Sequence, residues 1–175
     1  MEFNDVILMR RTTRSYEPHQ ISAEDLNTLL MAAHMAPIAG GDYTMTHMTV
    51  VQDAGLLNEL RQACMMKLPG KEEHIDAFYG APTVIFFSAR GISKDCIEYS
   101  NIGCAIENML LAATDRHLGS TYLWGCLRKL RPHPELIGRL QLPEGYEILS
   151  AVAVGYPTDP LVKREPVEKI SVNRI

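Results

Sequence analysis

Three arginines and two threonines stand together near the start of the chain, in the run Arg10-Arg11-Thr12-Thr13-Arg14. Arginine presents forked N–H donors that match the geometry of phosphate oxygens, and threonine adds a short hydroxyl donor. These residue types at this spacing predict a site that binds a phosphate or a similar anion. The alternative is a charged, solvated helix end, because apolar residues 6–9 precede the run and arginine is also favoured at the carbonyl end of a helix.

The rest of the sequence offers few side chains for catalysis. It contains no GxGxxG, GxSxG, HExxH or Walker A motif, and its six histidines are scattered. No two cysteines form a CxxC pair, so we expect buried free thiols rather than disulfides or a zinc site, at Cys64, Cys96, Cys104 and Cys126. If the protein is an enzyme, its chemistry belongs to a bound cofactor, and the chain supplies binding and orientation.

Two further segments have a backbone suited to meeting such a cofactor. Residues 38–44 form a loop with Gly40 and Gly41, where backbone N–H groups can approach a ligand closely. A plain connector is the alternative for this loop. Residues 120–125 end in Trp124-Gly125 and contain the single tryptophan, and their exposed amides could meet a ring-shaped ligand. The alternative here is a buried connecting strand with an ordinary core tryptophan.

The elements that must position these segments are a mixture of helices and strands. Helical periodicity and capping residues predict helices at 4–10 with Asn4 as cap, 23–36 after Ser22, 54–63 after Asp53, 95–118 before Gly119, and 134–140. A further helical turn or two is expected at 74–79, after a polar turn at 67–73. Apolar and β-branched runs predict strands at 46–51, 83–88 and 148–155, the second of them central in its sheet.

The helix predicted at 95–118 is apolar over most of its circumference, so we expect it in the middle of a domain or at a subunit interface. Glu107 and Asn108 then need polar partners in that apolar environment. Residues 157–175 are charged and contain three prolines, which indicates an arm that crosses a surface. The length of 175 residues suits a single domain with such an arm, spanning residues 1–175.

Composition excludes some functions and favours a location. The 17 Lys and Arg against 21 Asp and Glu, a net charge of -4, argue against nucleic-acid binding. The longest mostly apolar run, residues 102–113, is too short and too polar to span a membrane. The acidic N-terminus lacks a signal-peptide pattern, so we expect a cytoplasmic protein.

Five motifs occur in a characteristic order along the chain. Arg10 to Arg14 is similar to an Arg-Arg-Ser-x-Arg element, and Ala36-Pro37 to the start of an Ala-Pro-Ser loop. The other three are Asn108-Met109-Leu110-Leu111-Ala112-Ala113 with Leu118-Gly119-Ser120, then Leu142-Pro143 with Val154-Gly155-Tyr156-Pro157, and last Arg164-Glu165-Pro166-Val167-Glu168. Together these segments resemble the FMN-dependent nitroreductase family.

The resemblance implies a fold and a cofactor site. The fold is α+β, with a central, mostly antiparallel sheet flanked by helices, a long buried helix, and an extended C-terminal arm. The protein is a homodimer with FMN in two sites at the subunit interface. The cofactor contacts carried over from the family motifs are Arg10, Arg11, Thr12 and Arg14, with Arg164 on the phosphate, Ile38 and Gly41 from the second loop, and Trp124 and Gly125 beside the isoalloxazine.

The resemblance also implies an activity. NADH or NADPH reduces the flavin, leaves, and is replaced by a small electron acceptor such as a nitroaromatic or a quinone, in a ping-pong cycle with no obligatory side-chain acid. Residues 38–45 depart from the family, which usually has an Asn-x-Gln-Pro-Trp segment here, and the region before the long helix is short. Two alternatives therefore stay open: an FMN-binding carrier or regulatory protein with little turnover, and the same fold used for reductive dehalogenation or flavin destruction.

Overall fold

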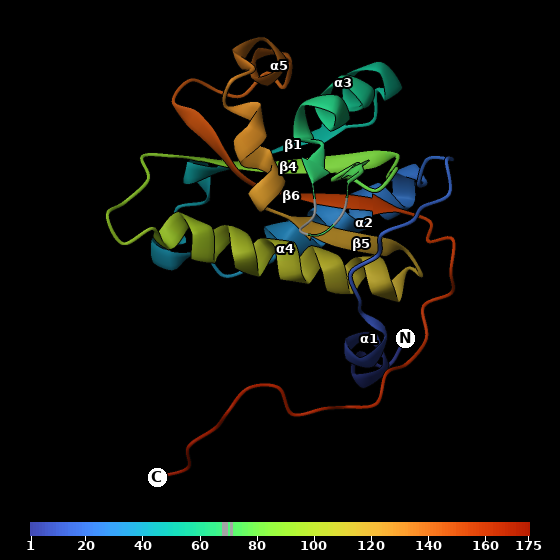
Figure 1. Ribbon diagram of the computed structural model, residues 1–175. Coiled ribbons are helices and arrows are strands. Elements are labelled where there is room, and N and C mark those ends of the chain that lie inside the picture. Colours follow the sequence, from blue (N-terminus) through green and yellow to red (C-terminus); the bar gives the residue numbers. More distant parts are fainter. Residues whose placement is uncertain (68–69, 71) are drawn as a thin grey trace.

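The protein is built around a four-stranded antiparallel sheet with the strand order β1-β4-β6-β5 (Figure 1). The computed structural model describes residues 1–67, 70 and 72–175. The strands are β1 (Thr46–Val51), β4 (Thr83–Arg90), β5 (Gly119–Leu123) and β6 (Tyr146–Gly155). The two central strands are long apolar runs because helices cover both of their faces. The predicted α+β fold with an antiparallel sheet is confirmed.

Two helical layers enclose the sheet (Figure 1). One face carries α2 (Ala23–His34) and α4 (Ile97–Asp115), and the other carries α3 (Ala54–Cys64), η3 (Gly125–Leu130) and α5 (Pro134–Arg139). Side chains of β4 alternate between the two cores, with Phe86 beneath α3 and Phe87 beneath α2 and α4. The sheet is therefore the wall between two hydrophobic clusters.

Local sequence signals explain how several elements begin. Ser22 accepts a hydrogen bond from the Asp25 amide at 3.0 Å, and Asp53 accepts one from the Leu56 amide at 2.7 Å. Both residues are the N-caps predicted from the sequence. The predicted strand at 46–51 and the central position of the strand beginning at Thr83 are confirmed as well.

The end of the long helix differs from the prediction. The helix α4 stops at Asp115, and His117 adopts the left-handed conformation (φ 58°) that the sequence suggested for Gly119. The Leu118 amide then bonds the Ala113 carbonyl at 2.8 Å, which completes a Schellman-type cap. Gly119 is instead the first residue of β5. The reason for a glycine at this position is therefore its contact with another segment and not the end of the helix.

Other predictions also need correction. The residues predicted as helical at 74–79 begin with β3 (His74–Ile75), which pairs with β2 (Met66–Lys67). The turn predicted at 67–73 therefore starts in a strand, and residues 68, 69 and 71 of it lie outside the described part of the chain. The first helix, α1, runs over Phe3–Met9 with Glu2 rather than Asn4 at its N-cap.

The environments of several polar and thiol side chains also differ from expectation. Cys64 and Cys126 are buried as expected, but Cys96 and Cys104 are exposed, and all four are free thiols. Glu107 is exposed rather than enclosed by apolar residues, because it lies on the outer face of α4. Asn108 does find a partner, the Ala32 carbonyl of α2 at 3.1 Å.

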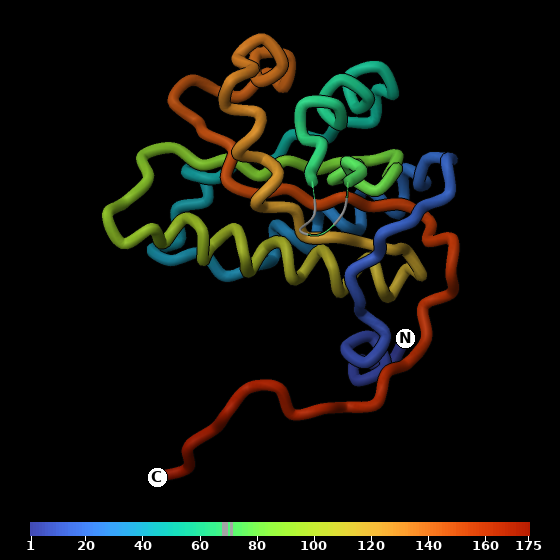
Figure 2. The backbone as a smooth tube through the Cα atoms, viewed as in Figure 1, coloured from blue at the N-terminus to red at the C-terminus, as the bar shows by residue number. Residues whose placement is uncertain are grey.

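The C-terminal segment passes beside the N-terminal helix, outside the sheet, before it continues to the C-terminus (Figure 2). Between β6 and the C-terminus, residues 157–175 contain no helix or strand, as predicted for an arm. This arm passes α1, where the Arg164 amide bonds the Leu8 carbonyl at 3.1 Å. Within the described residues, no helix combines the length and the apolar character needed to cross a membrane.

Candidate functional site

The arginine run lies in an extended segment against the outer edge of the sheet. After α1 ends, Thr12 forms a parallel bridge with Ser120 of β5, and the Thr13 amide bonds the Ser120 carbonyl at 3.0 Å. In an extended chain, successive side chains point to opposite sides. Thr13 is accordingly buried while its neighbours Thr12 and Arg14 are exposed.

Gly119 allows this close approach. A Cβ atom on Gly119 would lie 2.7 Å from Cγ2, 2.8 Å from Oγ1 and 2.9 Å from Cβ of Thr13. The Thr13 side chain thus fills the space that any other residue at position 119 would need. Among the described residues, the buried Thr13 Oγ1 has no hydrogen-bond partner. Packing against Gly119, rather than a hydrogen bond of its own hydroxyl, holds this side chain.

Tyr16 secures the other end of the segment. Its hydroxyl lies 3.1 Å from the Thr13 carbonyl, 2.9 Å from Thr121 Oγ1 and 3.4 Å from the Ala153 carbonyl. The Thr121 hydroxyl also donates to the Thr13 carbonyl. Burial raises the pKa of the Tyr16 phenol well above its usual value, so the group stays a neutral hydrogen-bond donor. The backbone of the arginine run is therefore fixed on two strands of the sheet.

The fixed backbone leaves the guanidinium groups few and weak partners. Arg10 Nε lies 3.6 Å from Glu107 on α4, and Arg11 donates to the Val162 carbonyl at 3.4 Å. Arg14 lies over the Tyr79 ring at 5.9 Å. These are long contacts between partly exposed groups, and such contacts contribute little to folding. Among the residues that the structure describes, most of the donors of the three arginines have no partner and are available for a ligand.

Arg164 reaches the same region from the C-terminal arm. Its Nε donates to the Leu8 carbonyl at 3.2 Å and its Nη2 to the Ile7 carbonyl at 3.4 Å. The sequence suggested that the arginine run binds the carbonyl end of a helix. In the structure, Arg164 makes this interaction with the last carbonyls of α1. A guanidinium has five donors, so these two bonds leave others for an anion.

A hollow of about 230 Å³ lies beside the run. Two arginines and several hydroxyls face it, together with the Asp159 carboxylate on its rim; the lining residues are Arg11, Thr12, Thr13, Arg14, Ser15, Pro157, Thr158, Asp159 and Leu161. The positive charges outnumber the single negative one. Forked donors and hydroxyls of this kind suit the oxygens of a phosphate, so the residues present fit a phosphate-bearing ligand.

Trp124 and Gly125 lie at the far end of the same edge strand. From Ser120 to Trp124 the strand advances about 13 Å, at about 3.3 Å per residue. The interpretation of Trp124 as an ordinary core residue is wrong, since its side chain is 53% exposed. The expectation of a buried strand before it is confirmed for most residues of β5. The Arg128 guanidinium lies 4.7 Å from its ring centroid. The strand thus connects a cationic end to an aromatic end.

Ile38 and Gly41 lie elsewhere in the chain. They belong to the loop after α2, where the Ala39 amide bonds Asn101 Oδ1 of α4 at 3.0 Å. Ile38 lines a mostly apolar cavity of about 360 Å³ beside β1, and Gly41 adopts a positive φ of 68°. β1 and β5 are opposite edges of the sheet, and Trp124 is not among the residues that line this cavity.

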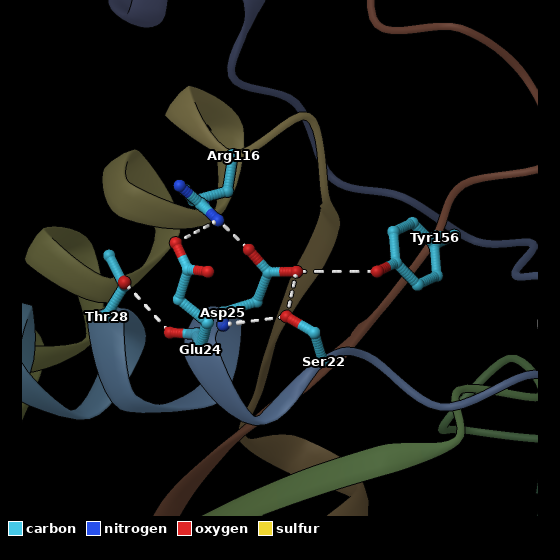
Figure 3. A network of polar contacts seen from close by, with 6 residues as sticks. All are labelled: Ser22, Glu24, Asp25, Thr28, Arg116 and Tyr156. Atoms are coloured by element: carbon cyan, nitrogen blue, oxygen red, sulfur yellow. Dashed lines mark hydrogen bonds and ion pairs between the residues drawn. The ribbon is translucent and has the colours of Figure 1, made fainter.

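A polar cluster fixes the point where the arm leaves the sheet (Figure 3). Asp25 is 7% exposed and accepts bonds from Arg116 Nε at 2.6 Å, from the Ser22 hydroxyl at 2.7 Å and from the Tyr156 hydroxyl at 3.4 Å. Arg116 also pairs with Glu24 at 3.0 Å. Burial alone would raise the pKa of Asp25, but the bonds from Ser22 and Arg116 outweigh it and lower the pKa.

Sequence reasoning did not identify the residues that hold the site in place. Thr121 and Gly119 act through contacts with a segment more than 100 positions away, and no local pattern marks such a contact. Tyr16 stands two residues after the arginine run. Its position beside this polar segment is the one feature of the sequence that could have indicated its role. In the described part of the chain, no group of three or more His, Cys, Asp or Glu side chains is arranged to hold a metal ion.

Comparisons with known proteins agree with this arrangement. The family model described as "Nitroreductase family" matches residues 7–156. A protein of Archaeoglobus fulgidus, provisionally named as an NADH dehydrogenase/NAD(P)H nitroreductase, is 31% identical over 174 residues, covering 97% of this chain and 94% of its own.

Two solved structures extend the comparison to the fold. A nitroreductase with bound FMN from Bacteroides fragilis is 30% identical, with a TM-score of 0.82 over 100% of this chain and 99% of that one. An FMN-dependent nitroreductase from Clostridium difficile is 28% identical, with a TM-score of 0.76 over 98% and 99%. The family match covers the arginine run, the long helix and all four strands of the sheet, and the chain therefore belongs to the nitroreductase family.

Proposed function

We propose that this protein is an FMN-dependent oxidoreductase that uses NADH or NADPH. The observation that carries the proposal is the arrangement along β5, where a cluster of largely unpaired guanidinium groups stands at one end and the exposed Trp124 at the other. FMN has a phosphate at one end and a flat ring at the other, so the two ends of β5 match the two ends of this cofactor. The FMN bound to the Bacteroides fragilis relative supports the same assignment.

Each part of the site then has a defined task. Arg10, Arg11, Thr12, Arg14 and Arg164 would hold the phosphate and ribityl oxygens, and Trp124 and Gly125 would orient the ring. FMN would supply the redox chemistry, by which electrons pass from NAD(P)H to a small acceptor such as a nitroaromatic or a quinone. No side chain is needed as an obligatory acid, so the contribution of the chain is binding, orientation and access.

We also propose that the working form is a homodimer. The loop with Ile38 and Gly41 precedes β1, the strand at the edge of the sheet opposite β5, so we assign the loop that borders the flavin ring to a second copy. The outer face of α4 exposes Cys104 and Glu107 beside the half-buried Leu111, which leaves it available for such packing. Sedimentation or size-exclusion chromatography should report a dimer, and a monomer that still holds FMN would contradict this arrangement.

The phosphate assignment is tested by measuring FMN affinity in variants. Arg14→Ala and Arg164→Ala should each weaken FMN binding by about 1.5–3 kcal/mol, the range for hydrogen bonds to charged groups. That loss corresponds to roughly 10- to 150-fold in Kd. Arg139→Ala is the matched control, because Arg139 pairs with Glu59 at 2.6 Å on the other face of the sheet. Unchanged affinity in both test variants would refute the assignment.

The altered loop at residues 38–45 favours one second candidate, an FMN-binding carrier or regulatory protein with little turnover. Anaerobic mixing of the FMN-loaded protein with NADH or NADPH separates the two candidates. Loss of the oxidised flavin absorbance supports the enzyme, and a flavin that neither nucleotide reduces supports the carrier. Screening of halogenated substrates and of flavin breakdown products tests the remaining chemistries of the same fold.

A further inference from the structure

A third cavity, of about 350 Å³, lies directly beside Trp124. It is enclosed by η3, the start of β6 and the first turn of α4. Trp124 forms one wall, and the aromatic rings of Tyr99 and Tyr146 contribute to the others. A volume of this size accommodates a small aromatic molecule, and aromatic walls suit the faces of its ring.

The charge in this cavity is predominantly positive. Arg128 and Arg131 both line it, and they are three residues apart at the end of η3, where residues i and i+3 lie on the same side. In the part of the chain that the structure describes, neither guanidinium has a carboxylate within ion-pair distance. Glu147 is the acidic residue of the lining. Two unpaired cations therefore face one carboxylate.

Neighbouring contacts keep these charges in the cavity. The Arg128 guanidinium is stacked 4.7 Å from the centroid of the Trp124 ring, which holds it beside this wall of the cavity. Lys129, which stands between the two arginines, instead donates to the Met65 carbonyl and points away. Of the three cations at the end of η3 and its C-cap, Arg128 and Arg131 therefore line the cavity and Lys129 does not.

We propose that this cavity binds the electron acceptor, and that Arg128 and Arg131 select an aromatic acceptor that carries a carboxylate or sulfonate group. The inference rests on the proposed function, because Trp124 lines the cavity and is also one of the residues assigned to the flavin ring. A guanidinium pairs with a carboxylate through two parallel hydrogen bonds, which fixes the orientation of the ring as well as its position. The anionic group lies at the arginines, and the ring of the acceptor lies against the aromatic walls of the cavity.

The proposed activity supplies all the electrons that the test reaction needs. With a nitro acceptor, one two-electron turnover breaks one N–O bond and yields the nitroso compound and water. It consumes one NAD(P)H and one proton from solvent and releases NAD(P)⁺. No further reductant is needed. Because the intrinsic reactivity of each acceptor is the same with every variant, a change in the ratio of the rates with two acceptors reports on how the protein binds and orients them.

Two acceptors of nearly equal size test the selection. 4-Nitrobenzoate carries the anionic group, and 4-nitrobenzamide is its neutral counterpart. In the FMN-loaded protein, kcat/KM should be higher for the benzoate than for the benzamide. The ratio of the two values should fall about tenfold in the Arg128→Gln/Arg131→Gln double variant, which corresponds to a loss of about 1.4 kcal/mol. Glu147→Gln should raise the preference. Arg139→Gln, on α5 and paired with Glu59, is the charge-matched control and should leave it unchanged.

A binding measurement removes any dependence on turnover. Trp124 is the only tryptophan of the chain, so all tryptophan fluorescence comes from the wall of this cavity, and with FMN bound throughout a change during the titration reports on the added ligand. Titration of the oxidised FMN-loaded protein with benzoate should give a lower Kd than titration with benzamide, and the difference should disappear in the double variant. Arg128→Lys retains the charge and should keep most of the difference, which separates a lost charge from a damaged fold.

The outcomes distinguish this inference from the function on which it rests. If the protein fails to bind FMN, or if NAD(P)H fails to reduce it, both proposals fall. If reduction proceeds but benzoate and benzamide behave alike, only the selection of an anionic acceptor is overturned. A double variant that changes the NADPH to NADH preference while the benzoate to benzamide ratio stays constant would assign the arginines to the reductant and overturn the inference.

Discussion

Gly119→Ala is the substitution that tests most directly how the arginine run is held. The added methyl group would lie 2.7 Å from Thr13 Cγ2, 2.8 Å from Oγ1 and 2.9 Å from Cβ, all closer than real Cβ contacts allow. Thr13 cannot easily move aside. Its carbonyl accepts from Thr121, and its amide is bonded to Ser120 at 3.0 Å.

Because Thr13 cannot easily move, the expected loss in the free energy of unfolding is large. Overpacking by one methyl group typically costs about 1–3 kcal/mol, and the rigid surroundings of Thr13 place Gly119→Ala in the upper part of that range. Relief requires the arginine run to move away from β5, which lengthens the Thr13–Ser120 bond and displaces Arg14. We therefore expect FMN affinity to fall about tenfold or more, because misplaced charged hydrogen bonds lose about 1.5–3 kcal/mol each.

Two measurements check this expectation. Urea unfolding of the FMN-free protein gives the stability change, and flavin fluorescence titration gives the Kd for FMN. Gly138→Ala on α5 is the matched control, since its Cβ would meet nothing within 4 Å. Replacing that glycine in a helix should be neutral or should stabilise by about 0.5–1 kcal/mol.

A second substitution identifies the contact that causes the effect. Thr13→Gly removes all three crowded atoms, so the double variant Gly119→Ala/Thr13→Gly should lose less stability than the sum of the two single variants. The reasoning is refuted if Gly119→Ala leaves both stability and FMN affinity unchanged. It is also refuted if the two substitutions are strictly additive, since the clash would then not involve Thr13.

Three further predictions follow from the polar and thiol groups of the core. Tyr16→Phe removes the donor to the Thr13 carbonyl and Thr121 and should cost about 1–3 kcal/mol in urea unfolding, with a weaker Kd for FMN. Burial raises the pKa of Cys64 to about 12 and of Cys126 to about 11, whereas an unfolded thiol titrates near about 8.5. Each folded thiol therefore stays neutral while the unfolded one ionises. The free energy of unfolding should therefore be unaffected by the thiols below about pH 8.5, and above this pH it should fall by up to about 1.4 kcal/mol per pH unit for each thiol. Cys126→Ala should make this fall less steep in unfolding curves measured between about pH 9 and 11. Asp25→Asn removes the charged partner of Arg116 and should cost about 1–3 kcal/mol at pH 7, with the difference from the unaltered protein shrinking as the pH falls below about 4 and Asp25 is protonated.

Local chemistry explains which parts of the fold were predictable. The caps at Ser22 and Asp53 and the strand at 46–51 depend on residues within a few positions of one another, so the sequence shows them directly. The end of α4 was misjudged because glycine is the commonest C′ residue, yet His117 takes the left-handed conformation there. The small pair β2 and β3 was missed because each strand has only two residues and depends on its partner for its shape.

The candidate site was predictable in its residue types but not in its assembly. Clustered arginines indicated an anion, and the family motifs added Arg164 and Trp124-Gly125. The contacts that fix them, from Tyr16 to Thr121 and from Thr13 to Gly119, join segments more than 100 residues apart. Their partners are set by the register of β5 against β6, which no single stretch of sequence contains.

The charges of the arginine run also argue that its purpose is binding rather than folding. The backbone is held by Thr13, Tyr16 and the bond to Ser120, none of which involves a guanidinium group. The ion pair from Arg10 to Glu107 is long at 3.6 Å and exposed, so it contributes about 0–1 kcal/mol. Three like charges within five residues repel one another in the absence of a counter-charge. The fold thus holds a repulsive cluster in place with neutral contacts, and this arrangement supports the proposal that the cluster binds an anion with several oxygens.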